Sequence, residues 1–327
     1  LKKEQDNNYQ FINDELQKIE SKVNDIFFFF RANKLAFSKQ KFLEQFEAKK
    51  DEINSNFDFF DCFEEYLTSG SLIKSYNTIK AQRTIKNYLK TFEEETGFVI
   101  TFDKLNDLFY EELMKYSFFE KEIKNNYFAK IIAVLKSFVR WSIDKNYTTN
   151  RDFEKFKGIE HDVDIIYLTY DELIKLYNHD FENSRLNHVK DFYCMGCFTG
   201  LRFSDLSQLH RANITETHIN ISIQKTKTQN HIISLNKFSK EILDKYRGTI
   251  YEPLPKISQQ KFNDYIKDCC EIIELDKPTT ITWFIGTKKV QNTVSKHQLI
   301  TSHTARKTFI TNSLLLGMEP KAIKKIA

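Results

Sequence analysis

The chain has 327 residues, of which 41% are hydrophobic, and it contains 30 phenylalanines and 15 tyrosines. This apolar content is enough for two or three domains, each with its own core, and it excludes an intrinsically disordered chain. Only 8 glycines and 4 prolines are present, so a mainly helical fold is predicted. No apolar run reaches membrane-spanning length and no signal peptide is apparent, and the five scattered cysteines favour a reducing cytoplasm.

The basic residues are unevenly distributed along the chain. Residues 281–327 carry eight lysine and arginine side chains against Glu319 alone, a net charge of +7 in a chain whose total is +4, so the preceding residues carry −3. Such a concentration is typical of a surface on which a polyanion docks, although a solvated lysine-rich surface would look the same.

Residues 1–55 predict two helices with a short break. Apolar residues repeat at helical spacing from Phe11 to Phe27, and Ser38 can begin the second helix. Because the first residue is Leu1 rather than Met, we expect that a further piece precedes it.

A helical domain is predicted over residues 56–150. Ser75 or Asn77 can cap a helix that runs to Glu95 and stops at Gly97. One face of this helix is basic and amide-bearing, which suits the DNA backbone and major groove, with a plain solvated face as the alternative; its members are Lys80, Arg83, Asn87 and Lys90. A second long helix is predicted from Asn125 to Asp144.

A second domain is predicted over residues 166–327, after a linker at residues 151–165. Thr169 and Glu172 form a capping box that begins its first helix. Alternating isoleucines at 219, 221 and 223, followed by apolar residues at 232–235, predict a β-hairpin. The remainder, 236–327, is predicted to be mainly helical.

Metal chemistry is not expected. Cys194 and Cys197 form a Cys-x-x-Cys pair, but no second pair follows at zinc-ligand spacing, so apolar helix packing explains them better. The chain also lacks an Asp/Glu cluster with metal-ligand spacing, and no cofactor is predicted.

Two arginine-containing segments are the most informative feature. Arg202 lies in Thr-Gly-Leu-Arg-Phe-Ser-Asp-Leu (199–206), and His303 and Arg306 lie in His-Thr-Ala-Arg (303–306). A guanidinium group binds a phosphoryl group bidentately, and residues three apart share a helical face. Together the three side chains could clamp one phosphodiester.

In this order, these two segments resemble the signature segments of the tyrosine recombinase (phage integrase) family. The resemblance covers roughly residues 56 to 327 and is strongest over 191–211 and 301–327. It implies a helical, SAM-like core-binding domain at 56–150 and a catalytic domain at 166–327 that contains a small β-hairpin, together forming a clamp around duplex DNA. Residues 1–55 would then be a remnant of, or a linker from, an arm-binding domain.

The resemblance also implies residue roles. Arg202 and Arg306 would cradle the scissile phosphate, and His303 would donate a hydrogen bond to it or assist proton transfer with the nucleophile. Asp205 would support the site by hydrogen bonds that orient the arginine or the His303 segment. A lysine of the hairpin turn would protonate the leaving 5′ oxygen; Lys225 fits best, with Lys227 as the alternative. Lys227 and Lys307 are further expected DNA contacts.

The family's nucleophile is a tyrosine about thirty residues beyond His-x-x-Arg. No tyrosine follows Tyr265 here, so the nucleophile is expected beyond residue 327, and this chain alone is expected to be inactive in cleavage.

The implied function is site-specific DNA recombination or integration through a 3′-phosphotyrosyl intermediate, in the manner of a mobile-element integrase. Expected partners are double-stranded DNA, further copies in a tetramer on paired DNA sites and accessory DNA-bending proteins, with no membrane. Two alternatives stay open, a type IB topoisomerase-like nicking-closing enzyme and a non-catalytic DNA-binding protein of the same fold.

Overall fold

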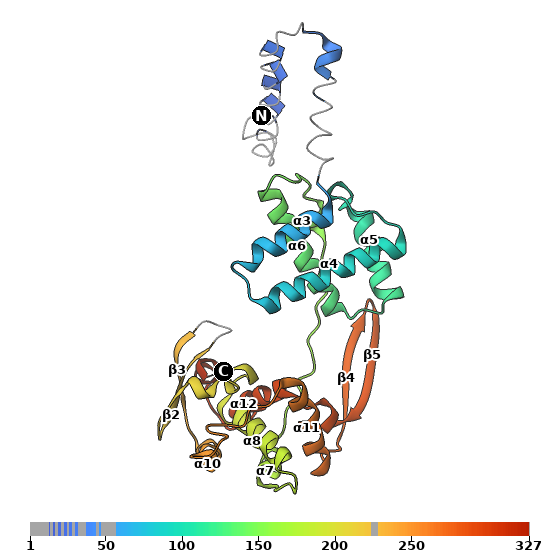
Figure 1. The fold of residues 1–327 in the computed structure, drawn as a ribbon. Coiled ribbons are helices and arrows are strands. Elements are labelled where there is room, and N and C mark those ends of the chain that lie inside the picture. The colour runs from blue at the N-terminus through green and yellow to red at the C-terminus, as the bar shows by residue number, and fades with distance from the viewer. Residues whose placement is uncertain are drawn as a thin grey trace. The chain divides into compact units, whose positions relative to one another are not determined.

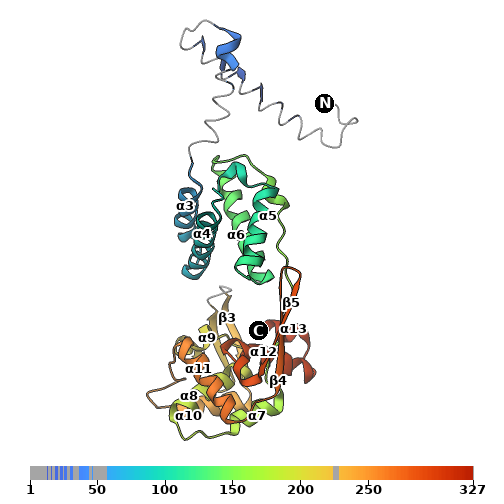
Figure 2. The same cartoon turned by 90° about the vertical axis from the view of Figure 1, so that its right-hand side faces the viewer.

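The computed structural model describes residues 57–223 and 228–326 without interruption and, before residue 57, only scattered residues (13, 16, 19–20, 23–24, 26–27, 30–31, 37–43 and 46). The helices expected within 1–55 therefore lie largely outside the described residues. The chain divides into two compact units (Figures 1 and 2). Unit 1 comprises Leu1–His161 and Phe284–Lys288, and unit 2 comprises Asp162–Trp283 and Lys289–Ala327.

Unit 1 is mainly helical in its described residues, apart from its loops and the strand ends within Phe284–Lys288. Its α-helices are α3 (Phe59–Ser71), α4 (Tyr76–Thr96), α5 (Asp107–Lys115) and α6 (Asn125–Asp144). A π-helical turn, η2 (Tyr116–Glu120), continues α5, and two 3₁₀ turns, η1 (Phe102–Lys104) and η3 (Asp152–Lys155), precede α5 and follow α6.

The helix ends of unit 1 follow local capping rules. Asp58 accepts hydrogen bonds from the backbone N–H groups of Phe60 and Asp61 and so begins α3. Ser75 is the N-cap of α4, and Gly97 ends it with a left-handed φ of 71°. The predicted helix over this segment is confirmed, with Ser75 rather than Asn77 as its cap. The predicted bounds of α6 are confirmed as well.

Phenylalanine rings fill the core of unit 1. The Phe63 and Phe138 rings stack with their centroids 4.2 Å apart, which ties α3 to α6. Phe153 and Phe156 are also buried in this core, next to η3. The first part of the predicted linker at 151–165 is thus packed structure, because two large apolar side chains anchor it, and the division between the units falls after His161.

Unit 2 is built around one buried helix. Its helices are α7 (Tyr170–Asn178), α8 (Ser184–Thr199), α9 (Phe203–Leu206), α10 (Lys237–Tyr246), α11 (Gln259–Ile272), α12 (Ser302–Leu315) and α13 (Pro320–Ile326), with short 3₁₀ turns η4 (Leu209–Arg211) and η5 (Lys296–Leu299). Every residue of α8 from Val189 to Thr199 is buried, and α7, α10, α11 and α12 pack against it. Thr169 and Glu172 form the predicted capping box of α7.

Two small antiparallel sheets follow, and the tip of the second, Phe284–Lys288, is counted with unit 1. The first has the order β1–β2–β3, from β1 (Asn213–Ile214), β2 (His218–Ile223) and β3 (Thr228–Ser234), and Ile219 pairs with Ile233. The predicted hairpin is therefore confirmed. The second sheet pairs β4 (Pro278–Ile285) with β5 (Lys288–Ser295). It lies within the segment predicted to be mainly helical, and that expectation is wrong for 278–295.

The fold class is mainly α with small antiparallel sheets, as predicted. Within the described part of the chain, no helix combines the length and the apolar character needed to cross a membrane.

Candidate functional site

The turn that carries Arg202 depends on a glycine. Gly200 ends α8 with a φ of 70°, and its backbone N–H donates to the carbonyl of Gly196. A Cβ atom at Gly200 would lie only 2.6 Å from the Phe309 ring, so both the backbone conformation and the neighbouring ring select glycine here. Leu201 is buried after this turn, and the half-buried Arg202 precedes α9.

Arg306 lies in the first two turns of α12 and is hydrogen-bonded to that glycine turn. Its Nη1 donates to the carbonyl oxygen of Gly200 at 2.7 Å, across 106 residues of sequence. This bond holds the His-x-x-Arg helix against the Thr-Gly-Leu-Arg turn. His303, one turn earlier on α12, is exposed.

The electrostatics of Arg306 identify its charged neighbours. Burial lowers the pKa of Arg306, the positive charge of Arg202 lowers it further, and Asp205 opposes both effects. The two guanidinium groups are therefore close enough to repel each other. Two cations held together in this way favour an anion between them.

Among the described residues, Asp205 does not make the expected hydrogen bond to an arginine. Its side chain is 2% exposed, its Oδ1 accepts from Ser204 Oγ at 3.4 Å, and its Oδ2 has no hydrogen-bond partner among the described residues. Within that part of the chain, Asp205 acts on Arg306 through its charge alone.

A buried hydroxyl pair connects α8 to the start of α12. Tyr193 Oη and Thr304 Oγ1 lie 2.9 Å apart, and Thr304 Oγ1 donates to the carbonyl of Thr301 at 2.7 Å. Thr304 lies between His303 and Arg306, so this link fixes the turn that presents both. This pairing of Tyr193 with Thr304 could not be predicted from the sequence, because no local pattern connects residues 111 positions apart.

The polar face of α12 continues into a second contact. Thr308 Oγ1 accepts from the backbone N–H of Leu168 at 2.9 Å, and Asn312 Nδ2 donates to the Leu168 carbonyl at 3.1 Å. Two side chains of α12 therefore hold the backbone of Leu168, just before α7.

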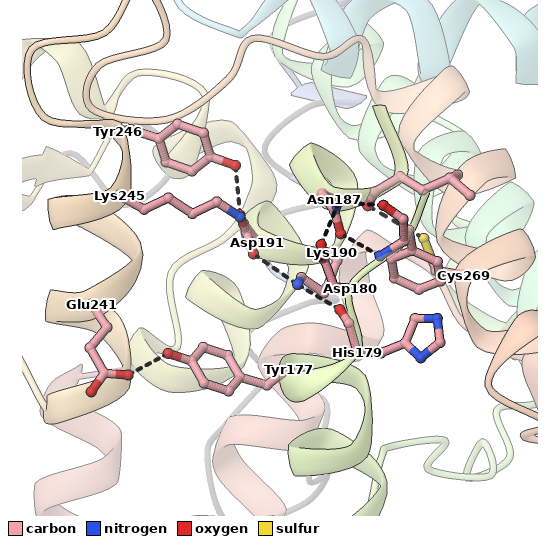
Figure 3. A network of polar contacts seen from close by, with 12 residues as sticks. Tyr177, His179, Asp180, Asn187, Lys190, Asp191, Glu241, Lys245, Tyr246 and Cys269 are labelled. Atoms are coloured by element: carbon pink, nitrogen blue, oxygen red, sulfur yellow. Dashed lines mark hydrogen bonds and ion pairs between the residues drawn. The ribbon is translucent and has the colours of Figure 1, made fainter. Parts of the chain in front are cut away.

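Figure 3 shows how the other end of α8 is held by a polar network. Asp191 Oδ2 accepts from Lys245 Nζ and from Tyr246 Oη of α10, each at 2.6 Å. Lys190 Nζ donates to the His179 carbonyl at 2.8 Å and lies 3.6 Å from Asp191 Oδ1. Burial, assisted by Asp191, raises the pKa of Tyr246. Because α8 leads directly into Gly200 and Arg202, this network stabilises the helix that positions Arg202.

The cysteines are core residues. Cys194 and Cys197 are 0% and 3% exposed, and their thiols are free. The packing interpretation of this pair is confirmed. Among the described residues, no group of three or more His, Cys, Asp or Glu side chains could hold a metal ion.

One cavity in unit 2 is apolar, and its lining does not include the arginines. It has a volume of about 610 Å³ and lies among α7, α8, α10 and α12; its lining includes Phe198, Phe238, Phe309, Leu316 and Met318. A phosphodiester of duplex DNA needs an open surface, so this cavity does not compete with the arginine site as the place of chemistry.

The predicted DNA-contacting residues of unit 1 lie on one helix. This helix is α4, and the four predicted side chains are all exposed: Lys80, Arg83, Asn87 and Lys90. Arg83 Nη2 donates to Glu64 Oε1 at 2.8 Å, so its charge is partly neutralised. In unit 2, Lys307 is half-buried, while Lys225 and Lys227 lie outside the described residues.

Comparison with known proteins gives matches to solved structures. No family model matches the chain, and no curated protein matches it significantly. A lambda integrase dimer bound to a COC′ core site is similar at 14% identity and a TM-score of 0.62, covering 86% of this chain and 76% of that one. A lambda integrase tetramer bound to a Holliday junction is similar at 14% identity and a TM-score of 0.58, covering 86% and 80%.

The Tn1549 transposon integrase in complex with transposon right end DNA is similar at 14% identity and a TM-score of 0.61, covering 83% of this chain and 90% of that one. The similarity therefore spans both units rather than one. The chain has the tyrosine recombinase fold.

Proposed function

We propose that the chain belongs to a site-specific DNA recombinase or integrase that cuts and rejoins DNA through a 3′-phosphotyrosyl intermediate. The observation that carries this proposal is the 2.7 Å hydrogen bond from Arg306 to the Gly200 carbonyl, which brings the two arginine segments together. The tyrosine recombinase fold agrees with it.

Arg202 and Arg306 are proposed to bind the two non-bridging oxygens of the scissile phosphate. Negative charge grows on these oxygens as the phosphorus becomes five-coordinate, and fixed guanidinium groups stabilise it without reorganising. His303, exposed on the same helical face, donates a hydrogen bond to the same phosphate. Asp205 offsets the repulsion between the arginines when DNA is absent.

The proposed reaction exchanges one ester bond for another. A tyrosine oxygen gives its proton to His303 and forms a bond to phosphorus, the bond from phosphorus to the 5′ oxygen breaks, and Lys225 gives a proton to that oxygen. Attack by a 5′ hydroxyl on the phosphotyrosine then reverses these steps and returns the protons to the lysine and to the tyrosine oxygen. Lys227 is the alternative general acid.

The attacking tyrosine is proposed to lie outside residues 1–327. Residues 266–327, which include His303 and Arg306, contain no tyrosine. Arginine and histidine side chains stabilise charge and move protons, but they do not replace the phenol as the nucleophile.

The exposed face of α4 is proposed to contact duplex DNA, with Lys227 and Lys307 contributing from unit 2. The lambda integrase tetramer was solved on a Holliday junction. By analogy, four copies of this protein are proposed to assemble on paired DNA sites.

The test compares two polypeptides on one substrate. Duplexes that bind the 327-residue chain are first selected from a random-sequence pool. Versions of each duplex are then nicked next to each phosphate in turn. Each nicked duplex is incubated with either the 327-residue chain or the product of the entire reading frame. A denaturing gel then detects covalent protein–DNA adducts. We expect the chain to bind but form no adduct, and the product of the entire reading frame to form one that Arg202→Ala abolishes.

Other outcomes distinguish the alternatives. An adduct formed by the 327-residue chain would show that another residue is the nucleophile. Binding by both polypeptides without any adduct would favour a non-catalytic DNA-binding protein. Relaxation of supercoiled DNA without recombination of paired sites would instead identify a type IB topoisomerase-like enzyme.

A further inference from the structure

The turn between α3 and α4, together with the first residue of α4, exposes three large apolar side chains to solvent. Leu72 is 86% exposed, Ile73 82% and Tyr76 79%, and together they form what we name the apolar turn. It joins the two helices at one edge of unit 1 (Figure 1). Side chains as exposed as these bury little apolar area on folding. A cluster of exposed apolar side chains is typical of an interaction surface.

The backbone beneath the apolar turn is firmly held. The backbone N–H groups of Ile73 and Lys74 both donate to the carbonyl of Gly70, at 3.1 and 2.8 Å. Lys74 Nζ donates to Tyr66 Oη at 2.9 Å and lies 4.2 Å from the centre of that ring. Ser75 then caps α4, so the apolar turn is held in one conformation before any partner binds.

The charge around the apolar turn favours a polyanionic partner. Residues 66–92 contain five lysine or arginine residues and no aspartate or glutamate. Arg83 and Lys86 pair with Glu64, while Lys80 and Lys90 remain exposed. The N-terminus of the long helix α4 also begins at this turn and favours negative charge.

We propose that the apolar turn enters the minor groove of bound duplex DNA and partly separates one base step. Leucine and isoleucine are among the side chains that act as such wedges, and the unstacking cost is offset by the extra contacts that bent DNA makes. The exposed lysines of α4 then contact the flanking phosphates. This inference rests on the proposed function, because it assumes that unit 1 binds DNA.

A sequence preference follows from this mode of binding. Pyrimidine–purine steps such as TpA unstack most easily, so they are favoured under the apolar turn although no base edge is read there.

The experiment places 2-aminopurine within TpA steps of short random-sequence duplexes, since its fluorescence rises when it is unstacked. The wild-type chain is compared with Leu72→Ser/Ile73→Ser and with Tyr76→Ser. Ile250→Ser serves as the control, because Ile250 is 92% exposed in a loop of unit 2. Circular dichroism checks that each variant is folded, and sedimentation measures its oligomeric state.

We expect wild type and the control to raise the fluorescence equally. The double variant should lose the rise and bind DNA about tenfold more weakly, with an unchanged dependence on salt. Equal fluorescence and affinity for wild type and the double variant would overturn the wedge while leaving DNA binding intact. A change in oligomeric state without a change in fluorescence would mean that the apolar turn contacts a second copy. Failure of the wild-type chain to bind any duplex would overturn the proposed function itself.

Discussion

At the residue scale, Gly200 joins a backbone requirement to a packing requirement. Its φ of 70° costs a residue with a Cβ about 1–2 kcal/mol, and contact with the Phe309 ring at 2.6 Å adds about 1–3 kcal/mol. Gly200→Ala should therefore lower the free energy of unfolding of unit 2 by about 2–5 kcal/mol, as measured by urea denaturation.

The matched control is Gly248→Ala in the same unit. Gly248 has a φ of 73° but nothing within 4 Å of the added Cβ, so only the backbone cost of about 1–2 kcal/mol should appear. Equal losses for the two variants would show that the Phe309 contact relaxes freely.

Arg306 shows a second residue-scale effect, since one side chain serves two purposes. Its guanidinium donates to the Gly200 carbonyl and still has further N–H groups for a phosphate, whereas a lysine offers one compact ammonium group. In the product of the entire reading frame, Arg306→Lys should lower the rate of covalent adduct formation about 10²–10³-fold. Arg185→Lys, which loses a hydrogen bond to Tyr265 Oη elsewhere in unit 2, should leave the rate unchanged. A similar loss in both variants would point to a general effect on folding.

At the element scale, the attachment of α12 to α8 rests on the buried Tyr193–Thr304 pair. Tyr193→Phe keeps the ring and removes the hydroxyl, so it should cost about 1–2 kcal/mol in unfolding free energy. Because Thr304 lies between His303 and Arg306, the same variant should also slow adduct formation.

Tyr246→Phe provides the comparison for this element. It removes a hydroxyl that donates to Asp191, while Lys245 continues to donate to that carboxylate. We expect a similar loss of stability without a change in the rate of adduct formation. If Tyr193→Phe reacted at the wild-type rate, the hydroxyl pair would be a structural contact only.

Elements whose signals are local could be predicted from the sequence. Ser75 and Gly97 mark the two ends of α4, and the Thr169–Glu172 capping box begins α7. The β4–β5 hairpin could not be predicted, because its turn at Gly286-Thr287 is not one of the strong hairpin dipeptides and only part of β4 alternates clearly.

In the candidate site, too, only the features with a local sequence signal could be predicted. The arginine segments could be found because their residue types stand close together in sequence. The role of the Gly200 carbonyl and of the Tyr193 hydroxyl could not, because both act across more than 100 residues through contacts that only folding creates. Lys225 and Lys227 as general acid remain a prediction.

At the scale of the whole molecule, DNA binding should be dominated by counterion release. Each phosphate contact that is lost should reduce the slope of log affinity against log salt by about 0.9. Lys90→Gln and Lys307→Gln, at exposed α4 and half-buried α12 positions, should each produce this change in a fluorescence polarisation titration.

Lys240→Gln is the control for the salt titration. Lys240 Nζ lies 2.8 Å from Glu216, so its charge is already paired within unit 2. Its substitution should leave the slope unchanged. A slope that responds equally to all three substitutions would indicate that only net charge matters and that no specific contacts are formed.

The burial of the cysteines makes the chain suitable for site-directed labelling. All five thiols are buried, and burial raises the pKa of Cys62 to about 11 and that of Cys269 to about 12. Maleimides react with the thiolate, which is scarce at neutral pH for such groups. A cysteine introduced at the exposed Ser71 would therefore be the preferred site of labelling in an otherwise unaltered chain. A fluorophore attached there would report on the environment of the neighbouring Leu72 in real time.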